Sequence, residues 1–277
     1  DQLQVDPAGA ARLGALMQEL TGDAPVDYDR IVEEAKREVI AGSLASEVDR
    51  LARVLDSLTS QDVRLRDHTL RDLRACIVEL LVAADQYRVY VVPGTPTNPE
   101  TAAILHDDAE RARQRLEPDQ SETLDLVVAI LLGEPVGSEG LSESPERAEA
   151  VIRFQQVCGA VTAKGVEDTA FYRWTHLTSL TEVGGNPAGF ALSADEAHAW
   201  ADRVQNIWPD TMVTSTTHDT KRGEDVRARL DVLASYADEW SDLVHRLRAM
   251  TAQERPLDLD GRSENLLWQT LWGTWAP

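Results

Sequence analysis

A histidine and an aspartate stand side by side as His218 and Asp219 in the stretch "TSTTHDTKR" at 214–222. An imidazole and a carboxylate can both hydrogen-bond sugar hydroxyls, and both bonds tighten when positive charge develops at the ring carbon. Lys221 and Arg222 follow at once. On spacing alone, a pair that caps the following helix, with both cations in solvent, is an equally good interpretation.

A second stretch, "VTAKGVEDTAFYRW" at 161–174, sets charged side chains beside aromatic ones. Sugars offer hydroxyl edges to charged groups and apolar C–H faces to aromatic rings, so this composition favours a carbohydrate site. The alternative is the end of a surface helix whose aromatic side chains pack on neighbouring helices. The residues in question are Lys164, Glu167, Asp168, Phe171 and Tyr172.

The element that positions the His–Asp pair is predicted to be a strand. Met212–Thr216 is a short apolar and β-branched run between two helical patterns, the second beginning near Glu224. In α/β barrels the reacting groups lie at the C-terminal ends of parallel strands. One strand cannot satisfy its own backbone in a core, and few partner strands are evident here. We therefore expect the chain to be a fragment of a larger fold.

The first half of the chain is predicted to be helical. Apolar residues recur at alternating spacings of three and four, which is the pattern of a buried helix stripe. Asn98-Pro99-Glu100 opens a further helix, and the last two patterns end at Gly133 and Gly159. The first two stripes are Leu44, Val48, Leu51, Leu55 and Leu58, then Leu70, Leu73, Ile77, Leu80 and Ala84.

Composition narrows the class of protein. The formal net charge of -21 repels phosphate backbones, and no basic patch offsets it, so a nucleic-acid partner is not expected. No apolar run approaches the length of a membrane span, so no membrane partner is expected either. Cys76 and Cys158 lie in apolar helical contexts and are predicted to be buried structural thiols, which fits a cytoplasmic location.

Three stretches together resemble one family. "AKGVEDTAFYR", "LTSLTEVGGNP" and "TSTTHDTKRGEDVRARL" are similar to segments of the maltooligosyltrehalose synthases, which belong to the α-amylase-type glycoside hydrolase superfamily. "EEAKREVIAGSLASEVDRLARVL" also resembles the helical segment that this family inserts into its barrel. The likeness runs from about residue 5 to residue 273, and its motifs are long enough to be specific.

The resemblance implies an enzyme of trehalose biosynthesis. Such enzymes convert the reducing-end α-1,4 linkage of a maltooligosaccharide into an α,α-1,1 linkage by intramolecular transglucosylation, without a cofactor or metal. Retention normally needs a nucleophile and an acid/base carboxyl about 5 Å apart, and the superfamily adds a third carboxylate, which Asp219 matches. We predict substrate contacts from His218, Lys164, Glu167, Asp168, Phe171, Tyr172, Lys221 and Arg222.

The chain departs from the family's pattern in one respect. It carries neither the Arg-x-Asp nucleophile nor the acid glutamate, and the "RDH" at 66–68 reads as a helix N-terminus. We therefore expect an internal fragment, inactive alone, whose partner is the missing N-terminal barrel half of the same enzyme. The predicted class is mainly α, with a helical insertion subdomain over 1–145 and an incomplete portion of a (β/α)8 barrel over 146–277.

Two other functions fit parts of the sequence. A metal-dependent phosphohydrolase would use His176 or His198, the dyad His218–Asp219, and Asp225 as ligands, but its dyad lies within a helix. A non-enzymatic helical scaffold would use the apolar stripes of the first 150 residues to bind partner helices. That second alternative leaves the sugar-compatible stretches after residue 160 unexplained.

Overall fold

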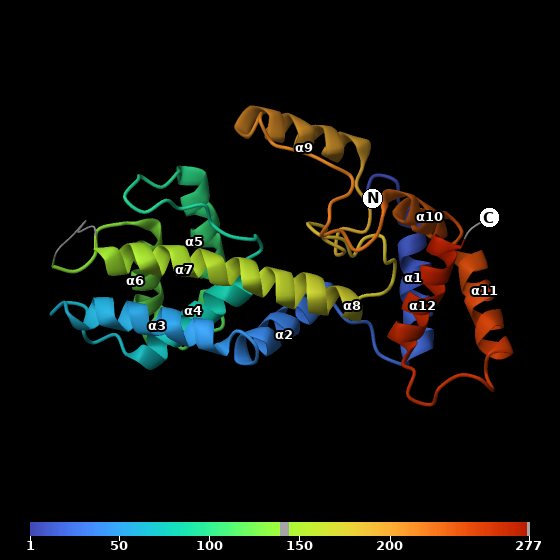
Figure 1. Cartoon of the computed structure of the whole chain (residues 1–277), viewed down its shortest axis with the longest axis horizontal. Helices are drawn as coiled ribbons and strands as arrows, with labels where there is room; N and C mark the ends of the chain where they lie inside the picture. The colour runs from blue at the N-terminus through green and yellow to red at the C-terminus, as the bar shows by residue number, and fades with distance from the viewer. Residues whose placement is uncertain (139–143, 276–277) are drawn as a thin grey trace. The chain divides into compact units, whose positions relative to one another are not determined.

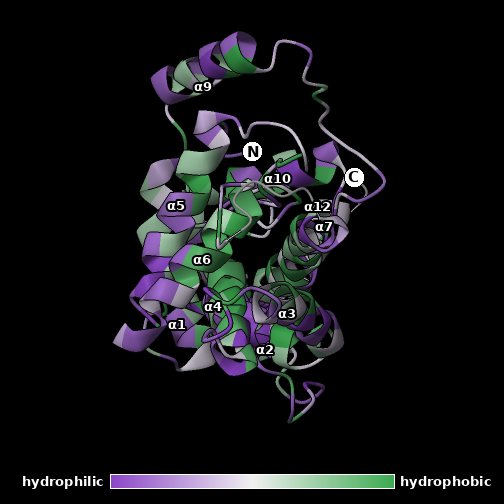
Figure 2. Cartoon of the chain, turned by 90° about the vertical axis from the view of Figure 1, so that its left-hand side faces the viewer, coloured by the Kyte–Doolittle hydropathy of each residue, from purple (hydrophilic) through white to green (hydrophobic). Residues whose placement is uncertain are grey.

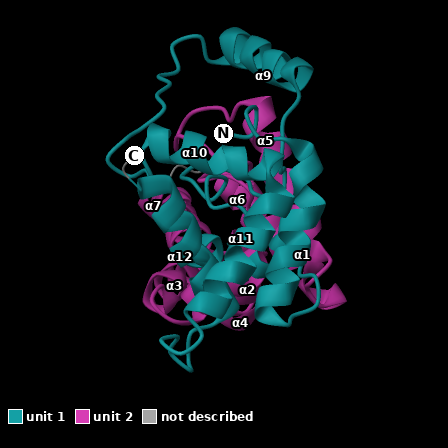
Figure 3. Ribbon diagram, turned by 90° about the vertical axis from the view of Figure 1, so that its right-hand side faces the viewer, with its two compact units in different colours: residues 1–31, 169–277 teal, residues 32–168 magenta. Residues whose placement is uncertain are grey.

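The chain is a helical protein of two compact units. The computed structural model describes residues 1–138 and 144–275. Unit 1 comprises residues 1–31 and 169–277, and unit 2 comprises residues 32–168 (Figure 3). The described residues contain helices and no strand (Figure 1), so the predicted mainly helical class is confirmed. The assignment of 1–145 and 146–277 to an insertion and a barrel stays a prediction.

Unit 2 is a bundle whose helices share one apolar core. Its central helix α4 packs against α3, α5 and α6, and α7 packs on α3 and α6. The predicted stripe of α3 is confirmed, since Val48, Leu51 and Leu55 are buried. The helices are α3 (Ala45–Ser60), α4 (Leu70–Ala83), α5 (Pro99–Arg113), η2 (Pro118–Gln120), α6 (Ser121–Leu132) and α7 (Pro145–Val161), with α2 (Tyr28–Ala41) crossing from unit 1.

Local sequence signals set several of the helix ends in unit 2. Asn98 caps α5, accepting a bond from the Glu100 amide at 2.9 Å. Thr69 caps α4, so the predicted helix start just after residues 66–68 is confirmed. Gly133 ends α6 with a φ of 75°, a left-handed conformation that glycine adopts without strain. In Figure 2, α4 and α6 carry much of the hydrophobic colour, as expected of buried helices.

The predicted end of α7 at Gly159 is wrong. The helix continues to Val161 and passes into η3 (Thr162–Ala170), a π-helix. Gly159 is absent from the described glycines with positive φ, so it does not cap the helix. Gly159 lies instead near the Tyr87 ring, because a Cβ added to it would stand 3.8 Å from the Tyr87 Cδ1.

Unit 1 is built around α1 (Ala10–Thr21), which packs on α11 (Ala237–Met250) and α12 (Gly261–Thr274). Helix α10 (Glu224–Ser235) packs on α12 and on η1 (Pro7–Gly9). The core includes Leu13, Leu16, Leu230 and Val244. The unit also contains α8 (Phe171–Arg173) and α9 (Ala194–Ile207), and α9 buries none of its residues.

The predicted strand Met212–Thr216 does not form. Residues 211–214 carry no regular secondary structure, and the Met212 and Val213 side chains are 95% and 75% exposed. The physical reason is that a strand needs a neighbouring strand to bond its backbone, and no described segment supplies one. Helix α10 does begin at Glu224, as predicted.

Two smaller predictions concern the thiols and the membrane. Cys76 and Cys158 are both free and buried, as predicted. Burial raises the pKa of the Cys76 thiol to about 12, so this group is an inert part of the core. Among the described helices, none combines the length and the apolar character that crossing a bilayer requires.

Candidate functional site

The loop between α9 and α10 carries the His–Asp pair at the surface of unit 1. His218 Nε2 lies 3.4 Å from Asp219 Oδ2, and the two side chains are 91% and 72% exposed. The pair sits in a closed turn, in which Thr217 Oγ1 accepts a bond from the Asp219 amide at 3.2 Å and Thr220 Oγ1 donates to the Thr217 carbonyl at 2.8 Å. Both functional groups are therefore available to a ligand.

The loop is anchored by a buried carboxylate that sequence reasoning did not single out. Glu182 Oε1 accepts a bond from the Lys221 amide at 2.6 Å, and Oε2 accepts one from the Arg222 amide at 2.9 Å. A third amide, that of Val183, donates to Oε1 at 2.9 Å. Hydrogen bonds to an ionised acceptor are shorter and stronger than neutral ones. Glu182 thus fixes the backbone immediately after the dyad.

Arg227 on α10 supports the same loop from the other side. Its Nη1 donates to the Arg222 carbonyl at 2.7 Å, and its Nη2 donates to the Ser215 carbonyl. The Arg227 and Glu182 side chains are 6% and 7% exposed, with Nη1 and Oε2 3.8 Å apart. The guanidinium fork therefore bonds the loop at two points while it compensates the buried carboxylate.

The segment that carries Glu182 is itself held by α12. Residues 175–182 are mostly buried but form no helix, so their backbone groups need other partners. Gln269 Oε1 accepts from the Thr178 amide at 2.8 Å, and Gln269 Nε2 donates to the Thr175 carbonyl at 2.9 Å. Asn265 Nδ2 donates to that same carbonyl at 2.6 Å. Two amide side chains of α12 thus replace the backbone partners that a sheet would supply.

Unit 1 brings together members of both predicted stretches. The Lys221 ammonium lies 5.6 Å from the centroid of the Tyr172 ring, within the range of a cation–π interaction. Burial lowers the pKa of Arg222, an effect that the charge of Glu182 opposes. Phe171, by contrast, is buried in the structure. Tyr172, half exposed, is the aromatic side chain of this stretch that lies beside the loop.

A polar cleft of about 820 Å³ lies beside the loop in unit 1, and neither His218 nor Asp219 lines it. Its wall combines carboxylates, hydroxyls and one indole ring, which are groups that suit a polyhydroxylated ligand. The wall includes Glu182, Asn186, Trp200, Thr217, Thr220 and Asp225.

The other three predicted residues belong to unit 2 and lie on η3. Lys164 Nζ and Asp168 Oδ2 form an exposed ion pair at 2.7 Å, and Glu167 is buried and accepts a bond from Tyr87 Oη at 2.7 Å. Gly165 lies against α2, because an added Cβ would stand 3.1 Å from the Lys36 Cα. π-Helical turns are rare and occur often at functional sites. Their approach to the unit 1 loop stays a prediction.

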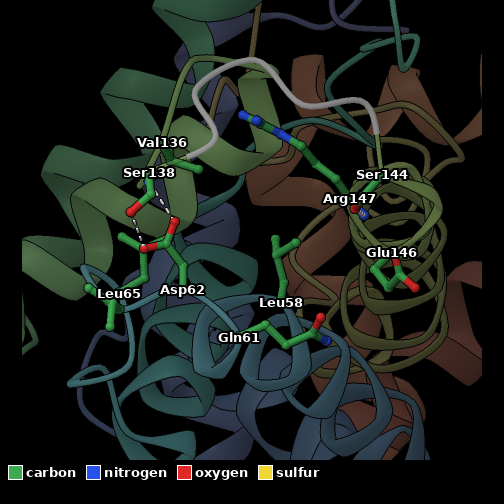
Figure 4. Close-up of a pocket in the computed structure, with 10 residues that line it drawn as sticks. Leu58, Gln61, Asp62, Leu65, Val136, Ser138, Ser144, Glu146 and Arg147 are labelled. Atoms are coloured by element: carbon green, nitrogen blue, oxygen red, sulfur yellow. Dashed lines mark hydrogen bonds between the residues drawn. The ribbon is translucent and has the colours of Figure 1, made fainter.

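A small cavity of about 190 Å³ lies elsewhere in unit 2 (Figure 4). Leu58 and Leu65 line it, and Asp62 Oδ1 accepts a bond from Ser138 Oγ at 2.9 Å. The amides of Ser138 and Arg64 lower the pKa of Asp62. The Asp62 carboxylate is therefore already bound by the protein, and none of the predicted site residues lines the cavity.

The phosphohydrolase alternative finds no support in the arrangement of its ligands. Residues 1–138 and 144–275 contain no group of three or more His, Cys, Asp or Glu side chains placed to hold one metal ion. His176 stacks on Trp174, with the ring centroids 3.8 Å apart. Burial lowers the pKa of His176 to about 4, so at neutral pH it is uncharged.

Comparison with known proteins confirms the resemblance seen in the sequence. No protein-family model matches the chain. It is 34% identical over 276 residues to proteins from two Mycobacterium tuberculosis strains named as maltooligosyl trehalose synthases, which covers 98% of this chain and 31% of theirs. The chain therefore spans about a third of the length of these relatives.

Solved structures agree with this comparison. The maltooligosyltrehalose synthase of Arthrobacter ramosus superposes with a TM-score of 0.76 at 34% identity, over 100% of this chain and 32% of that one. A hypothetical maltooligosyl trehalose synthase of Sulfolobus tokodaii has a TM-score of 0.63 at 21% identity, over 98% of this chain and 32% of that one, and supports the fold alone.

Proposed function

We propose that this chain is the segment of a maltooligosyltrehalose synthase that supplies one of its catalytic carboxylates. The whole enzyme would convert the reducing-end α-1,4 linkage of a maltooligosaccharide into an α,α-1,1 linkage by intramolecular transglucosylation. The observation that carries the proposal is similarity to such synthases over 98% of the chain, with Asp219 exposed on a loop that buried groups hold in place.

In this proposal Asp219 stabilises the transition state. Its carboxylate would bind sugar hydroxyls and oppose the positive charge that develops at the anomeric carbon. His218 lies 3.4 Å away and would bind a neighbouring hydroxyl. Lys221, Arg222 and the Tyr172 ring would complete the substrate contacts on this side. Lys164, Glu167, Asp168 and Phe171 are proposed for the same pocket on the sequence resemblance alone.

The remaining groups of the reaction come from other parts of the enzyme in this proposal. A retaining transfer needs a nucleophile and an acid/base carboxyl about 5 Å apart, and the resemblance assigns neither to this chain. We propose that the N-terminal half of the barrel supplies them, that no cofactor takes part, and that the enzyme works in the cytoplasm, where buried free thiols such as Cys76 and Cys158 persist.

The fold of the whole enzyme is part of the same proposal. We place residues 146–277 in the wall of a (β/α)8 barrel and residues 1–145 in an inserted helical subdomain. Exposed Met212 and Val213 support this, since apolar side chains precede the dyad where a barrel strand would be buried. Pairing with a neighbouring strand would bury them and complete the ladder that is absent among the described residues.

A chimera tests the proposed function. The chain would replace the matching third of the Arthrobacter ramosus synthase, and the loss of reducing ends from maltopentaose would be measured, because an α,α-1,1 linkage leaves no reducing end. We expect Asp219→Asn to slow this loss roughly 100-fold or more, as removal of one strong transition-state contact does. Asp210→Asn, an exposed carboxyl of the same loop, is the matched control and should be nearly silent. An unchanged rate in Asp219→Asn would exclude this residue from the mechanism.

A further inference from the structure

The backbone on both sides of Asp219 is bonded to two buried charged side chains, Glu182 and Arg227. Glu182 binds the Lys221 and Arg222 amides after it, at 2.6 and 2.9 Å. Arg227 binds the Ser215 carbonyl before it. The exposed turn between these anchors is therefore short, and Asp219 has little freedom to move independently of them.

We propose that Glu182, supported by Arg227, is a positioning residue that fixes this backbone and thereby directs the Asp219 carboxylate toward the sugar. That Glu182 directs Asp219 toward a sugar rests on the proposed function. That Glu182 fixes the loop does not. Glu182 does not itself contact the reacting atoms in this proposal.

Burial and geometry distinguish these two side chains from ordinary surface ions. A buried ion pair contributes little net stability by comparison with apolar side chains of the same volume, so stability alone gives weak reason for a Glu–Arg pair here. Both carboxylate oxygens and two of the guanidinium nitrogens instead bond loop backbone. Functional side chains need to be held to within about 0.5 Å by supporting hydrogen bonds of this kind.

The support continues inward from Glu182 to the rigid part of the unit. Its own segment is bonded at Thr178 by Gln269 of α12, a helix that packs on α1. The helical core therefore holds the buried segment 175–182 through Gln269, and this segment in turn holds the loop through Glu182. Loss of the Glu182 charge should release the loop without unfolding α1, α10, α11 or α12.

The first test uses the 277-residue chain and needs no activity. Glu182→Gln keeps the size of the side chain but replaces one acceptor oxygen by an amide group, so one of the two loop amides loses its acceptor. We expect the Lys221 or the Arg222 amide, whichever faces the new amide group, to exchange with deuterium roughly 10- to 100-fold faster, as the loss of a hydrogen bond to a charged group implies. The Asp219 amide should also become more mobile by ¹⁵N relaxation.

Controls separate positioning from general stability. Glu239→Gln changes an exposed glutamate of α11 and should leave loop exchange unaltered. Arg227→Lys keeps the charge but loses the fork, so it should loosen the loop in the same way. If Glu182→Gln leaves the exchange of both amides unchanged, the proposal is wrong. If all of unit 1 exchanges faster, Glu182 serves folding rather than position, and the proposal is likewise wrong.

The second test uses the chimera described above. Glu182→Gln should lower kcat roughly tenfold with little change in KM, because an ill-placed Asp219 weakens the transition state more than binding. Combined with Asp219→Asn it should cost nothing further, since residues that act as a unit are not additive. Additive losses would overturn the positioning role. An inactive parent chimera would instead contradict the proposed function, while the exchange test still decides whether Glu182 fixes the loop.

Discussion

At the residue scale, the charged side chains of the candidate site differ in burial according to their proposed roles. The carboxylate proposed to meet the sugar, Asp219, is exposed, and the charges that hold its loop, Glu182 and Arg227, are buried. An exposed carboxylate is free to bind a ligand, whereas buried charges stay only where hydrogen bonds compensate them. The same reasoning assigns His176 to structure, because burial keeps it uncharged.

His176 gives unit 1 a specific sensitivity to acid. Its folded pKa of about 4 lies below the ordinary value of 6.5, so the unfolded state binds more protons between these values and stability falls as the pH drops through that window. We expect His176→Phe, which keeps a ring on Trp174, to remove a loss on the order of 2 kcal/mol between pH 7 and pH 4.5. Urea unfolding at both pH values measures it, and equal losses in the two proteins would refute it.

At the scale of elements, helix ends and one irregular helix decide where the site residues lie. Caps such as Thr69 and Asn98 are encoded locally, and they set the ends of α4 and α5. The π-helix η3 is different, since it continues α7 beyond Gly159 and carries Lys164, Glu167 and Asp168. Gly165 allows η3 to approach α2 closely, which is a tertiary requirement.

The N-cap of α4 offers a test at this scale. Thr69 Oγ1 accepts a bond from the Asp72 amide at 3.2 Å. Thr69→Ala leaves that amide without its side-chain acceptor, and we expect the free energy of unfolding of unit 2 to fall by about 1 kcal/mol. Amide exchange along α4 measures the change. Thr69→Ser keeps the hydroxyl and should retain most of the stability, and an equal loss in both variants would show that the cap bond is not the cause.

At the scale of the whole molecule, each unit has its own apolar core. The core of unit 2 is centred on residues such as Leu55, Ile77 and Phe154, and that of unit 1 on residues such as Leu16 and Leu230. All seven tryptophans lie at or after residue 174, so they report on unit 1 alone.

Substitutions in the two cores should therefore give different signals. Phe154→Ala removes a ring that is 1% exposed and should destabilise unit 2 by about 3 kcal/mol or more. An added Cβ at Gly261 would stand 2.3 Å from the Leu20 carbonyl oxygen, so Gly261→Ala should destabilise unit 1. During urea unfolding, tryptophan fluorescence should change at lower urea in Gly261→Ala. The part of the far-ultraviolet circular dichroism signal that unit 2 contributes should be lost at lower urea in Phe154→Ala. The same shift of both signals in both variants would contradict separate cores.

Local sequence patterns were enough to predict the helices, the burial of the two thiols and the resemblance. Apolar stripes, Asn and Thr caps and the terminal Gly133 act within a few residues, so α3, α4, α5 and α6 follow from local patterns. The stretches around Lys164, Glu182 and Asp219 gave the resemblance to the maltooligosyltrehalose synthases, and the solved structure of one such synthase superposes on the whole of this chain at 34% identity.

The anchoring of the site loop and the conformation of the residues before it depend on tertiary packing. Met212–Thr216 reads as a strand, but a strand depends on partners distant in sequence, and the described residues supply none. Glu182 lies 37 positions before Asp219 in the printed sequence, and no local pattern connects a buried carboxylate to the amides that it binds. The one available signal for Glu182 was its place in "LTSLTEVGGNP", a stretch that resembles the synthases. Hydrogen bonds between distant segments are fixed by packing, which periodicity and composition do not encode.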